Sequence, residues 1–279
     1  MVKRIAVKSL LITTTLVCFA FSGRAPAYAQ PVPSGCQPPP QVEPLDLTAP
    51  INIGLLKPHL DRYRCIAYDD DVKATLAQAH DWLAAHVSEF DKPALVLDID
   101  ETSLSNWEQI YHNDFAYIPS GACDLKSSSG CGQREWELSA SAAVLQPTLE
   151  LFNFAKTLKG RDGSPLAVFF VTGRYEDPFE RLATEWNLRR VGYDQWQQLY
   201  MRPDATRSKL VSAYKKQARA DIEDRQRYTI VSNIGDQFSD LVGGHAQKCF
   251  KVPNPFYFIP GEPLPTVGLT CLASAQTSK

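Results

Sequence analysis

The sequence predicts an α/β fold with a central parallel sheet between helices, and two observations carry this prediction. Three short apolar runs, residues 94–99, 166–171 and 228–234, lack polar alternation, which is typical of strands buried on both faces. Helical patterns lie between these runs, and strands that alternate with helices form parallel sheets.

The helices follow from apolar residues that recur at helical spacing. The first such pattern covers residues 70–90 and precedes the first strand. Further helical patterns cover residues 148–158, 178–186 and 209–225. A short apolar run near residues 249–252 is expected to add a strand to the sheet.

Residues 105–145 interrupt the alternation after the first strand, so we expect a small insert, or cap, above the sheet. The insert contains Trp107, Tyr111 and Trp136. Two interpretations of these rings stay open. They pack the insert itself, or they stack on a nucleobase or aryl group of a substrate.

The first 29 residues have the layout of a secretory signal peptide. Lys3 and Arg4 precede an apolar run, which is followed by Ala27 and Ala29 in an A-x-A arrangement. We expect an exported product, periplasmic or secreted, without stable membrane insertion after cleavage. Residues 30–60 then form a Pro-rich arm, and residues 61–279 form the main domain.

The charge of the expected mature chain argues against a polyanionic partner. The full sequence has a formal net charge of -2, and residues 1–29 contain four basic residues and no acidic ones. Cleavage therefore leaves a mildly acidic protein, with no basic stripe for a nucleic acid polymer. Small substrates are favoured, and the sequence leaves open whether the chain forms a homo-oligomer.

An even number of cysteines in an exported chain indicates disulfide bonds. Cys123 and Cys131 flank a short loop rich in Ser and Gly, which is the easiest to close. The pair Cys249 and Cys271 is the second expectation. No cysteine or histidine spacing supports a zinc site. The six cysteines after the expected cleavage are Cys36, Cys65, Cys123, Cys131, Cys249 and Cys271.

Polar residues follow three of the predicted strands, where the reactive groups of parallel sheets usually lie. Asp98 and Asp100 follow the first strand, residues 172–174 (Thr-Gly-Arg) follow the second, and Asp236 and Asp240 follow the third. Carboxylates crowded at one edge repel one another unless a cation balances them. Mg²⁺ prefers such oxygen ligands, so the pattern predicts a magnesium site.

This arrangement suits phosphoryl transfer. One carboxylate attacks phosphorus and forms an aspartyl-phosphate, which divides one difficult displacement into two easier ones. The second carboxylate protonates the leaving alkoxide and later takes a proton from the hydrolytic water. A hydroxyl and a lysine would hold the phosphoryl oxygens.

Four segments resemble the haloacid dehalogenase (HAD) superfamily, in particular its acid phosphatase branch. They are residues 95–103, 170–174, 214–219 and 230–240, and the resemblance extends over roughly residues 66–257. The branch includes class B-like and class C bacterial acid phosphatases and plant vegetative storage proteins. The resemblance implies a Rossmann-like three-layer core with a small cap, and a Mg²⁺-dependent acid phosphatase that hydrolyses small phosphomonoesters, such as nucleotides or aryl phosphates.

The resemblance also implies roles for individual residues. Asp98 would be the nucleophile and a metal ligand, and Asp100 the acid/base whose backbone carbonyl also faces the metal. Asp236 would complete the protein ligands. Thr172 and Gly173 would bind phosphate.

Three assignments stay open at this point. Lys215 best matches the motif lysine, but Lys216 and Lys209 are alternatives. Asp240 would be either a carboxylate behind the metal ligands or an additional metal contact. Arg174 would either pair with a carboxylate or touch the substrate.

Two rival functions also stay open. One is a storage or binding protein of the same fold with weak catalysis, and the other is a phosphotransferase that uses an alcohol in place of water. The presence of Asp98 argues against the first rival, because a protein without catalysis could lose its nucleophile. The second rival needs the same residues as a phosphatase.

Overall fold

The computed structural model describes residues 42–262 and Cys271. All of them belong to one compact unit, residues 31–279. The expected signal peptide, Cys36 and the first part of the Pro-rich arm lie outside the described residues. Among the residues that are described, no helix is long and apolar enough to cross a membrane.

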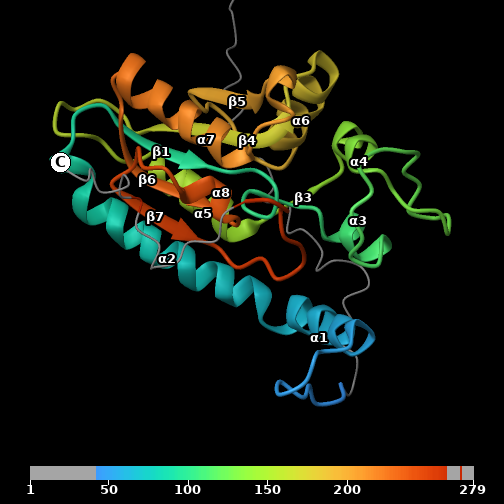
Figure 1. Cartoon of the computed structure of the whole chain (residues 1–279). Helices are drawn as coiled ribbons and strands as arrows, with labels where there is room; N and C mark the ends of the chain where they lie inside the picture. The colour runs from blue at the N-terminus through green and yellow to red at the C-terminus, as the bar shows by residue number, and fades with distance from the viewer. Residues whose placement is uncertain (1–41, 263–270, 272–279) are drawn as a thin grey trace, which may run out of the picture. The chain divides into compact units, whose positions relative to one another are not determined.

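A five-stranded sheet forms the centre of this unit, with the strand order β5-β4-β1-β6-β7 (Figure 1). All four neighbouring pairs are parallel, which confirms the predicted α/β class. The strands are β1 (Pro93–Leu97), β4 (Ala167–Tyr175), β5 (Gln198–Arg202), β6 (Thr229–Gly235) and β7 (Lys248–Lys251).

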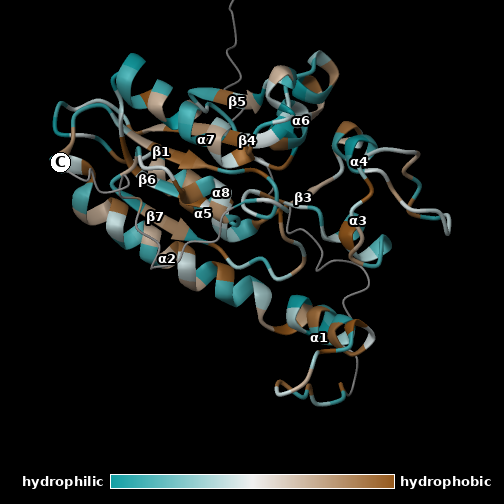
Figure 2. Ribbon diagram, in the orientation of Figure 1, coloured by the Kyte–Doolittle hydropathy of each residue, from teal (hydrophilic) through white to brown (hydrophobic). Residues whose placement is uncertain are grey.

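Helices cover both faces of the sheet and make three layers (Figure 1). On one face, α2 (Tyr68–His86) and α5 (Gln146–Ala155) bury apolar side chains against alternate residues of β1, Leu95 and Leu97. On the other face, α7 (Val211–Ala220) packs on Ala94 and Val96. Every residue of β1 is therefore buried, as its apolar composition requires, and β1 is correspondingly brown in Figure 2.

The remaining elements are shorter or lie at the edges. Asp177 caps the start of helix α6 (Pro178–Arg190). Its side chain accepts hydrogen bonds from backbone N–H groups of the first turn. A helix not expected from the sequence, α1 (Ile53–Ile66), begins inside the range 30–60, so the arm ends earlier than expected. The others are α8 (Phe238–Leu241), the 3₁₀ turns Val87–Glu89 and Asp204–Thr206, and the π-helical turn Asp221–Arg225.

The insert after β1 contains helices α3 (Trp107–His112) and α4 (Gln133–Ser139). Its base is a two-stranded antiparallel ribbon of β2 (Leu104–Ser105) and β3 (Ala143–Val144). Trp107 and Trp136 are buried, and the Trp136 indole donates a hydrogen bond of 2.8 Å to the Asn106 side chain. These two rings therefore pack the insert, whereas Tyr111 is exposed.

Both cysteine pairs that the spacing favoured are joined in the structure. The bond between Cys123 and Cys131 closes a loop of the insert. The bond between Cys249 and Cys271 ties residue 271 to β7, the last strand of the sheet. Such cross-links stabilise the fold mainly by restricting the unfolded chain.

Candidate active site

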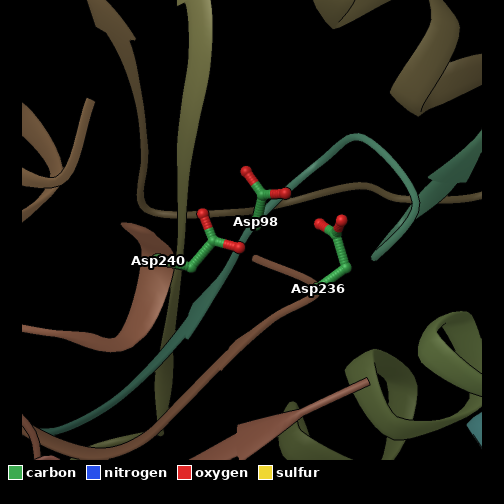
Figure 3. A group of neighbouring side chains, drawn as sticks. All are labelled: Asp98, Asp236 and Asp240. Carbon is green, nitrogen blue, oxygen red and sulfur yellow. The ribbon is translucent and has the colours of Figure 1, made fainter. Parts of the chain in front are cut away.

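Three carboxylates meet at the carboxyl edge of the sheet. Asp98 directly follows β1 and Asp236 directly follows β6, and these strands are parallel neighbours in which Leu97 pairs with Ile234. Asp240 comes from the short helix α8. One carboxylate oxygen of each aspartate lies within 4.8 Å of the others, and Figure 3 shows the three groups converging.

Lys215 on α7 is the cation of this cluster. Its Nζ donates to Oδ1 of Asp98 and to Oδ1 of Asp240. Lys209 and Lys216, the two alternatives considered from the sequence, are both exposed. The geometry therefore brings Lys215, and neither of the alternatives, to the carboxylates.

The cluster carries more negative than positive charge in a buried place. Burial and the neighbouring Asp240 raise the pKa of Asp98 well above its usual value. Burial, followed by Asp240, raises the pKa of Asp236 to about 7. For Lys215, burial opposes the charged form, but the two carboxylates outweigh it and raise the pKa. One ammonium thus does not balance three carboxylates.

A divalent cation would supply the missing charge, and the donors suit Mg²⁺. They are all carboxylate oxygen atoms, which Mg²⁺ prefers as ligands, and they lie within 4.8 Å of one another. The carboxylates that the structure groups are Asp98, Asp236 and Asp240. The Asp100 carboxylate points away from this group. Asp100 could therefore act as a metal ligand, as expected, only through its backbone carbonyl.

Asp236 is held in place by three side chains. The amide groups of Gln237 and Asn254 each donate to Oδ2 at 2.7 Å, and the Thr102 hydroxyl donates to Oδ1 at 3.2 Å. Oδ1 keeps lone-pair capacity for a further partner. Sequence reasoning did not find Gln237 or Asn254, because both lie outside the pattern of carboxylates after strands.

Gly235 makes room for Asp240. A Cβ atom at position 235 would lie 2.3 Å from both Cβ and Oδ2 of Asp240, and no real Cβ approaches so closely. Asp240 is also fixed by the Gln237 backbone N–H, which donates to Oδ2 at 2.8 Å. The absence of a side chain at residue 235 therefore allows the third carboxylate to reach the cluster.

Asp100 pairs with Arg174. The guanidinium donates from Nη2 to Oδ1 at 2.6 Å and from Nε to Oδ2 at 3.1 Å, and Asn106 adds a hydrogen bond of 2.9 Å. Burial favours the neutral acid, but Arg174 outweighs burial and lowers the pKa of Asp100. Of the two roles considered for Arg174, the structure therefore shows the first, in which Arg174 pairs with a carboxylate.

Thr172 and Gly173 lie in β4, next to β1, where Leu97 pairs with Phe170. Thr172 is buried, and its hydroxyl accepts a hydrogen bond of 3.1 Å from the Arg174 N–H. Within the described part of the chain, Thr172 makes no hydrogen bond to the three carboxylates. Both residues lie at the same edge of the sheet as the cluster.

Glu101 is a buried carboxylate that sequence reasoning left without a role. It accepts hydrogen bonds from the Asn106 side chain at 3.1 Å and from the Tyr257 hydroxyl at 2.9 Å. Burial, followed by the charge of Asp100, raises its pKa to about 7. Its position inside the Asp98–Thr102 segment was the only sequence feature that could have drawn attention to it.

A hollow of about 390 Å³ opens beside Asp236. Its walls are formed by aromatic rings, a lysine and loop residues that follow β6 and β7. The hollow is large enough for a small organic group and adjoins the cluster through Asp236. The lining residues are Asp236, Gln237, Phe238, Lys251, Asn254, Pro255, Tyr257 and Phe258.

Comparison with known proteins identifies relatives of this chain. Residues 56–260 match the family described as HAD superfamily, subfamily IIIB (Acid phosphatase). The stem 28 kDa glycoprotein of Glycine max is 32% identical over 195 residues, which cover 69% of this chain and 70% of that protein. Acid phosphatase 1 of Solanum lycopersicum is 32% identical over 165 residues, covering 59% of this chain and 58% of that protein.

Vegetative storage protein 1 of Arabidopsis thaliana is 39% identical over 166 residues, covering 59% of this chain and 55% of that protein. The chain therefore spans little more than half the length of two of these relatives. Among solved structures, the class C acid phosphatase from Bacillus anthracis has a TM-score of 0.53 at 20% identity, covering 70% of this chain and 82% of that one. This likeness shows the fold.

Gly235→Ala should lower the free energy of unfolding by about 1–3 kcal/mol, because the added methyl group pushes Asp240 away from the cluster. The matched control is Gly173→Ala, whose Cβ would make an ordinary contact of 3.5 Å with Val211. Chemical denaturation of both variants checks this. Equal stability of the two variants would contradict the close approach at residue 235.

Proposed function

The chain belongs to the HAD superfamily, subfamily IIIB (acid phosphatase), and from this premise we propose that it is a Mg²⁺-dependent acid phosphatase for small phosphomonoesters. The observation that carries the proposal is the buried cluster in which Lys215 contacts both Asp98 and Asp240, with Asp236 beside them. Hydrolysis through an aspartyl-phosphate uses a carboxylate nucleophile, a metal site and a cation together, and the residue types of this cluster support that chemistry.

In the proposed mechanism, Asp98 attacks the phosphorus atom and displaces the alcohol, which forms an aspartyl-phosphate. Asp100 in its acid form protonates the leaving oxygen and then, as carboxylate, accepts a proton from the water that cleaves the intermediate. Lys215 and the N–H and hydroxyl groups of residues 172–173 bind the phosphoryl oxygens. Asp98, Asp236 and the Asp100 backbone carbonyl would hold Mg²⁺, which would stabilise the charge that develops on these oxygens.

The pairing of Asp100 with Arg174 supports an acidic working range. The first step needs the protonated carboxyl group, and Arg174 stabilises the ionised one. The acid form is therefore well populated only at low pH. Arg174 also keeps the carboxylate in position for the second step.

Two features of the chain support a function outside the cytoplasm. The arrangement of residues 1–29 is typical of a signal peptide, and disulfide bonds such as Cys123–Cys131 and Cys249–Cys271 form in oxidising compartments. We propose a periplasmic or secreted location. The substrate is then a small phosphomonoester that reaches this compartment, with nucleotides and aryl phosphates as candidates.

A second candidate function is storage or binding with weak catalysis. The name of one relative, vegetative storage protein 1 of Arabidopsis thaliana, favours it. Asp98 and its contact with Lys215 argue against it, because storage needs neither group. A phosphotransferase would share the whole cluster and would differ only in the acceptor of the phosphoryl group.

Hydrolysis of p-nitrophenyl phosphate by the purified protein tests the proposal. We expect hydrolysis with Mg²⁺, its loss in chelator and its recovery when Mg²⁺ is restored. Asp98→Asn keeps the shape but removes the nucleophile, so kcat should fall at least about 10³-fold. Full activity in the variant would exclude the mechanism, and no hydrolysis by the unaltered protein over a broad pH range would favour storage.

Lys215→Met should lower kcat/KM by about 10²–10³-fold, because the variant lacks the cation that faces the phosphoryl oxygens. The adjacent Lys216→Met is the matched control and should keep full activity, since its side chain is exposed. Steady-state kinetics with Mg²⁺ distinguish them, and circular dichroism checks that both fold. Similar kinetics in the two variants would show that the role assigned to Lys215 is wrong.

Arg174→Gln should move the high-pH limb of the kcat profile to higher pH. Without the guanidinium the pKa of Asp100 rises, so its acid form persists to higher pH. Arg181→Gln is the matched control, because Arg181 pairs on the surface with Glu176. An unchanged limb in Arg174→Gln would mean that Asp100 is not the general acid.

A further inference from the structure

Glu137 is a carboxyl group of the insert that the proposed mechanism does not use. It lies on α4 and is half-buried. Its Oε1 atom accepts a hydrogen bond of 2.9 Å from the Gln133 side chain. Within the described part of the chain, the Oε2 atom of Glu137 makes no hydrogen bond. One polar atom of this side chain is therefore available to a ligand.

Helix α4 lies beside α6 and runs in the same direction (Figure 1). Near the beginning of the two helices, Nε of Arg134 lies 2.7 Å from Oε1 of Glu180. Near their ends, Nη2 of Arg190 donates a hydrogen bond of 2.8 Å to the Ala140 carbonyl. Glu137 follows Arg134 by one turn and is therefore on the same side of α4. It lies between the two contacts, level with the middle of α6.

The middle of α6 is also where Arg174 is bound. Thr184 accepts a hydrogen bond of 3.2 Å from the Arg174 guanidinium, which pairs with the Asp100 carboxylate. The electrostatics agree with this placement of Glu137. Burial raises the pKa of Glu137 to about 7, and the next largest effects come from Arg174, which lowers the pKa, and from Asp100, which raises it.

The residue before Glu137 connects α4 to Asp100 by a second route. The Trp136 indole donates a hydrogen bond of 2.8 Å to the Asn106 side chain, and Asn106 donates one of 2.9 Å to the Asp100 carboxylate. Helix α4 is thus held to Asp100 both through this chain of contacts and through α6. The fold therefore fixes where Glu137 lies relative to the proposed acid/base.

On its other side Glu137 approaches the surface. Tyr117 is exposed, and partial desolvation, followed by the charge of Glu137, raises its pKa. Glu137 thus lies between a surface ring and the pair of Asp100 and Arg174. In the proposed mechanism Asp100 protonates the leaving oxygen, so the carbon atoms of the leaving alcohol begin beside Asp100. Glu137 is the carboxyl group of the insert that they meet there.

The acid form of Glu137 suits a hydroxyl group. Because burial raises its pKa to about 7, the acid form predominates at acidic pH. Oε1 accepts from Gln133, so the proton lies on Oε2, where the group can both donate and accept. An alcohol hydroxyl matches both capacities. A hydrocarbon chain would leave the Oε2 group desolvated without a partner, which costs free energy.

We propose that Glu137 determines substrate specificity, because its Oε2 atom hydrogen-bonds a hydroxyl group of the leaving alcohol. The site then favours polyol and sugar phosphates over phosphate esters of simple alcohols. This inference rests on the proposed phosphatase function and names the substrate class of the same site.

The kcat/KM ratio of two substrates tests this role. α-Glycerophosphate and propyl phosphate have the same carbon skeleton, but only the first has hydroxyl groups on its leaving alcohol. With Mg²⁺ at acidic pH, we expect the unaltered protein to prefer α-glycerophosphate by about 10-fold or more. Glu137→Leu should reduce the preference to about 2-fold or less, because leucine has no hydrogen-bonding group. Glu137→Gln should retain it, since the amide both donates and accepts.

Glu150→Leu is the matched control. Glu150 on α5 accepts a hydrogen bond from Gln146, four residues earlier, as Glu137 does from Gln133, but Glu150 is exposed. Its replacement should leave the preference unchanged. Circular dichroism checks that the variants fold, and Glu137→Met is a second variant without an O–H group if Glu137→Leu does not fold.

Three results would overturn the specificity role of Glu137. They are no preference in the unaltered protein, the same preference in Glu137→Leu, and loss of the preference in Glu137→Gln, which would show that the carboxylate charge acts and not the neutral acid. Hydrolysis of p-nitrophenyl phosphate separates this inference from the proposed function. If that ester is hydrolysed, each of these results overturns only the role of Glu137, whereas no hydrolysis of any ester overturns both.

Discussion

The charge balance around Lys215 is the interaction on which the site depends. Its ammonium group lies between Asp98 and Asp240 in a buried place. Removing one partner of such a buried group costs about 3–5 kcal/mol, because the remaining charge has no solvent to stabilise it. The strands β1 and β6, helix α7 and helix α8 all contribute a residue, so the cluster also fixes how these elements meet. The negative charge that Lys215 leaves unbalanced makes the cluster suitable for a further cation.

A second ion pair has a different purpose. Asp100 is two residues from Asp98, yet its carboxylate points to Arg174 and not to the cluster. The two carboxyl groups of one short segment are thereby given opposite pKa shifts, upward for Asp98 and downward for Asp100. Arg174 in turn donates a hydrogen bond to Thr184, which connects the proposed acid/base to helix α6.

Much of this arrangement could be predicted from the sequence, because buried parallel strands are apolar without alternation and reactive groups follow their ends. That rule found Asp98 and Asp236. The edge strand β5 was not predicted, since its sequence is partly polar, as an edge permits. Lys215 was the preferred motif lysine from the sequence, but Lys209 and Lys216 stayed open until α7 was seen to turn Lys215 inward. Glu101 and Asn254 escaped prediction because their contacts come from tertiary packing, which no local pattern encodes.

The most direct test of the account is to identify the residue that carries the phosphoryl group. Turnover in Mg²⁺ is quenched with acid, and the digested protein is analysed by mass spectrometry. The account predicts phosphate on the peptide that contains Asp98, and on the carboxylate of that residue. Phosphate on another residue, or turnover without any phosphorylated peptide, would contradict it.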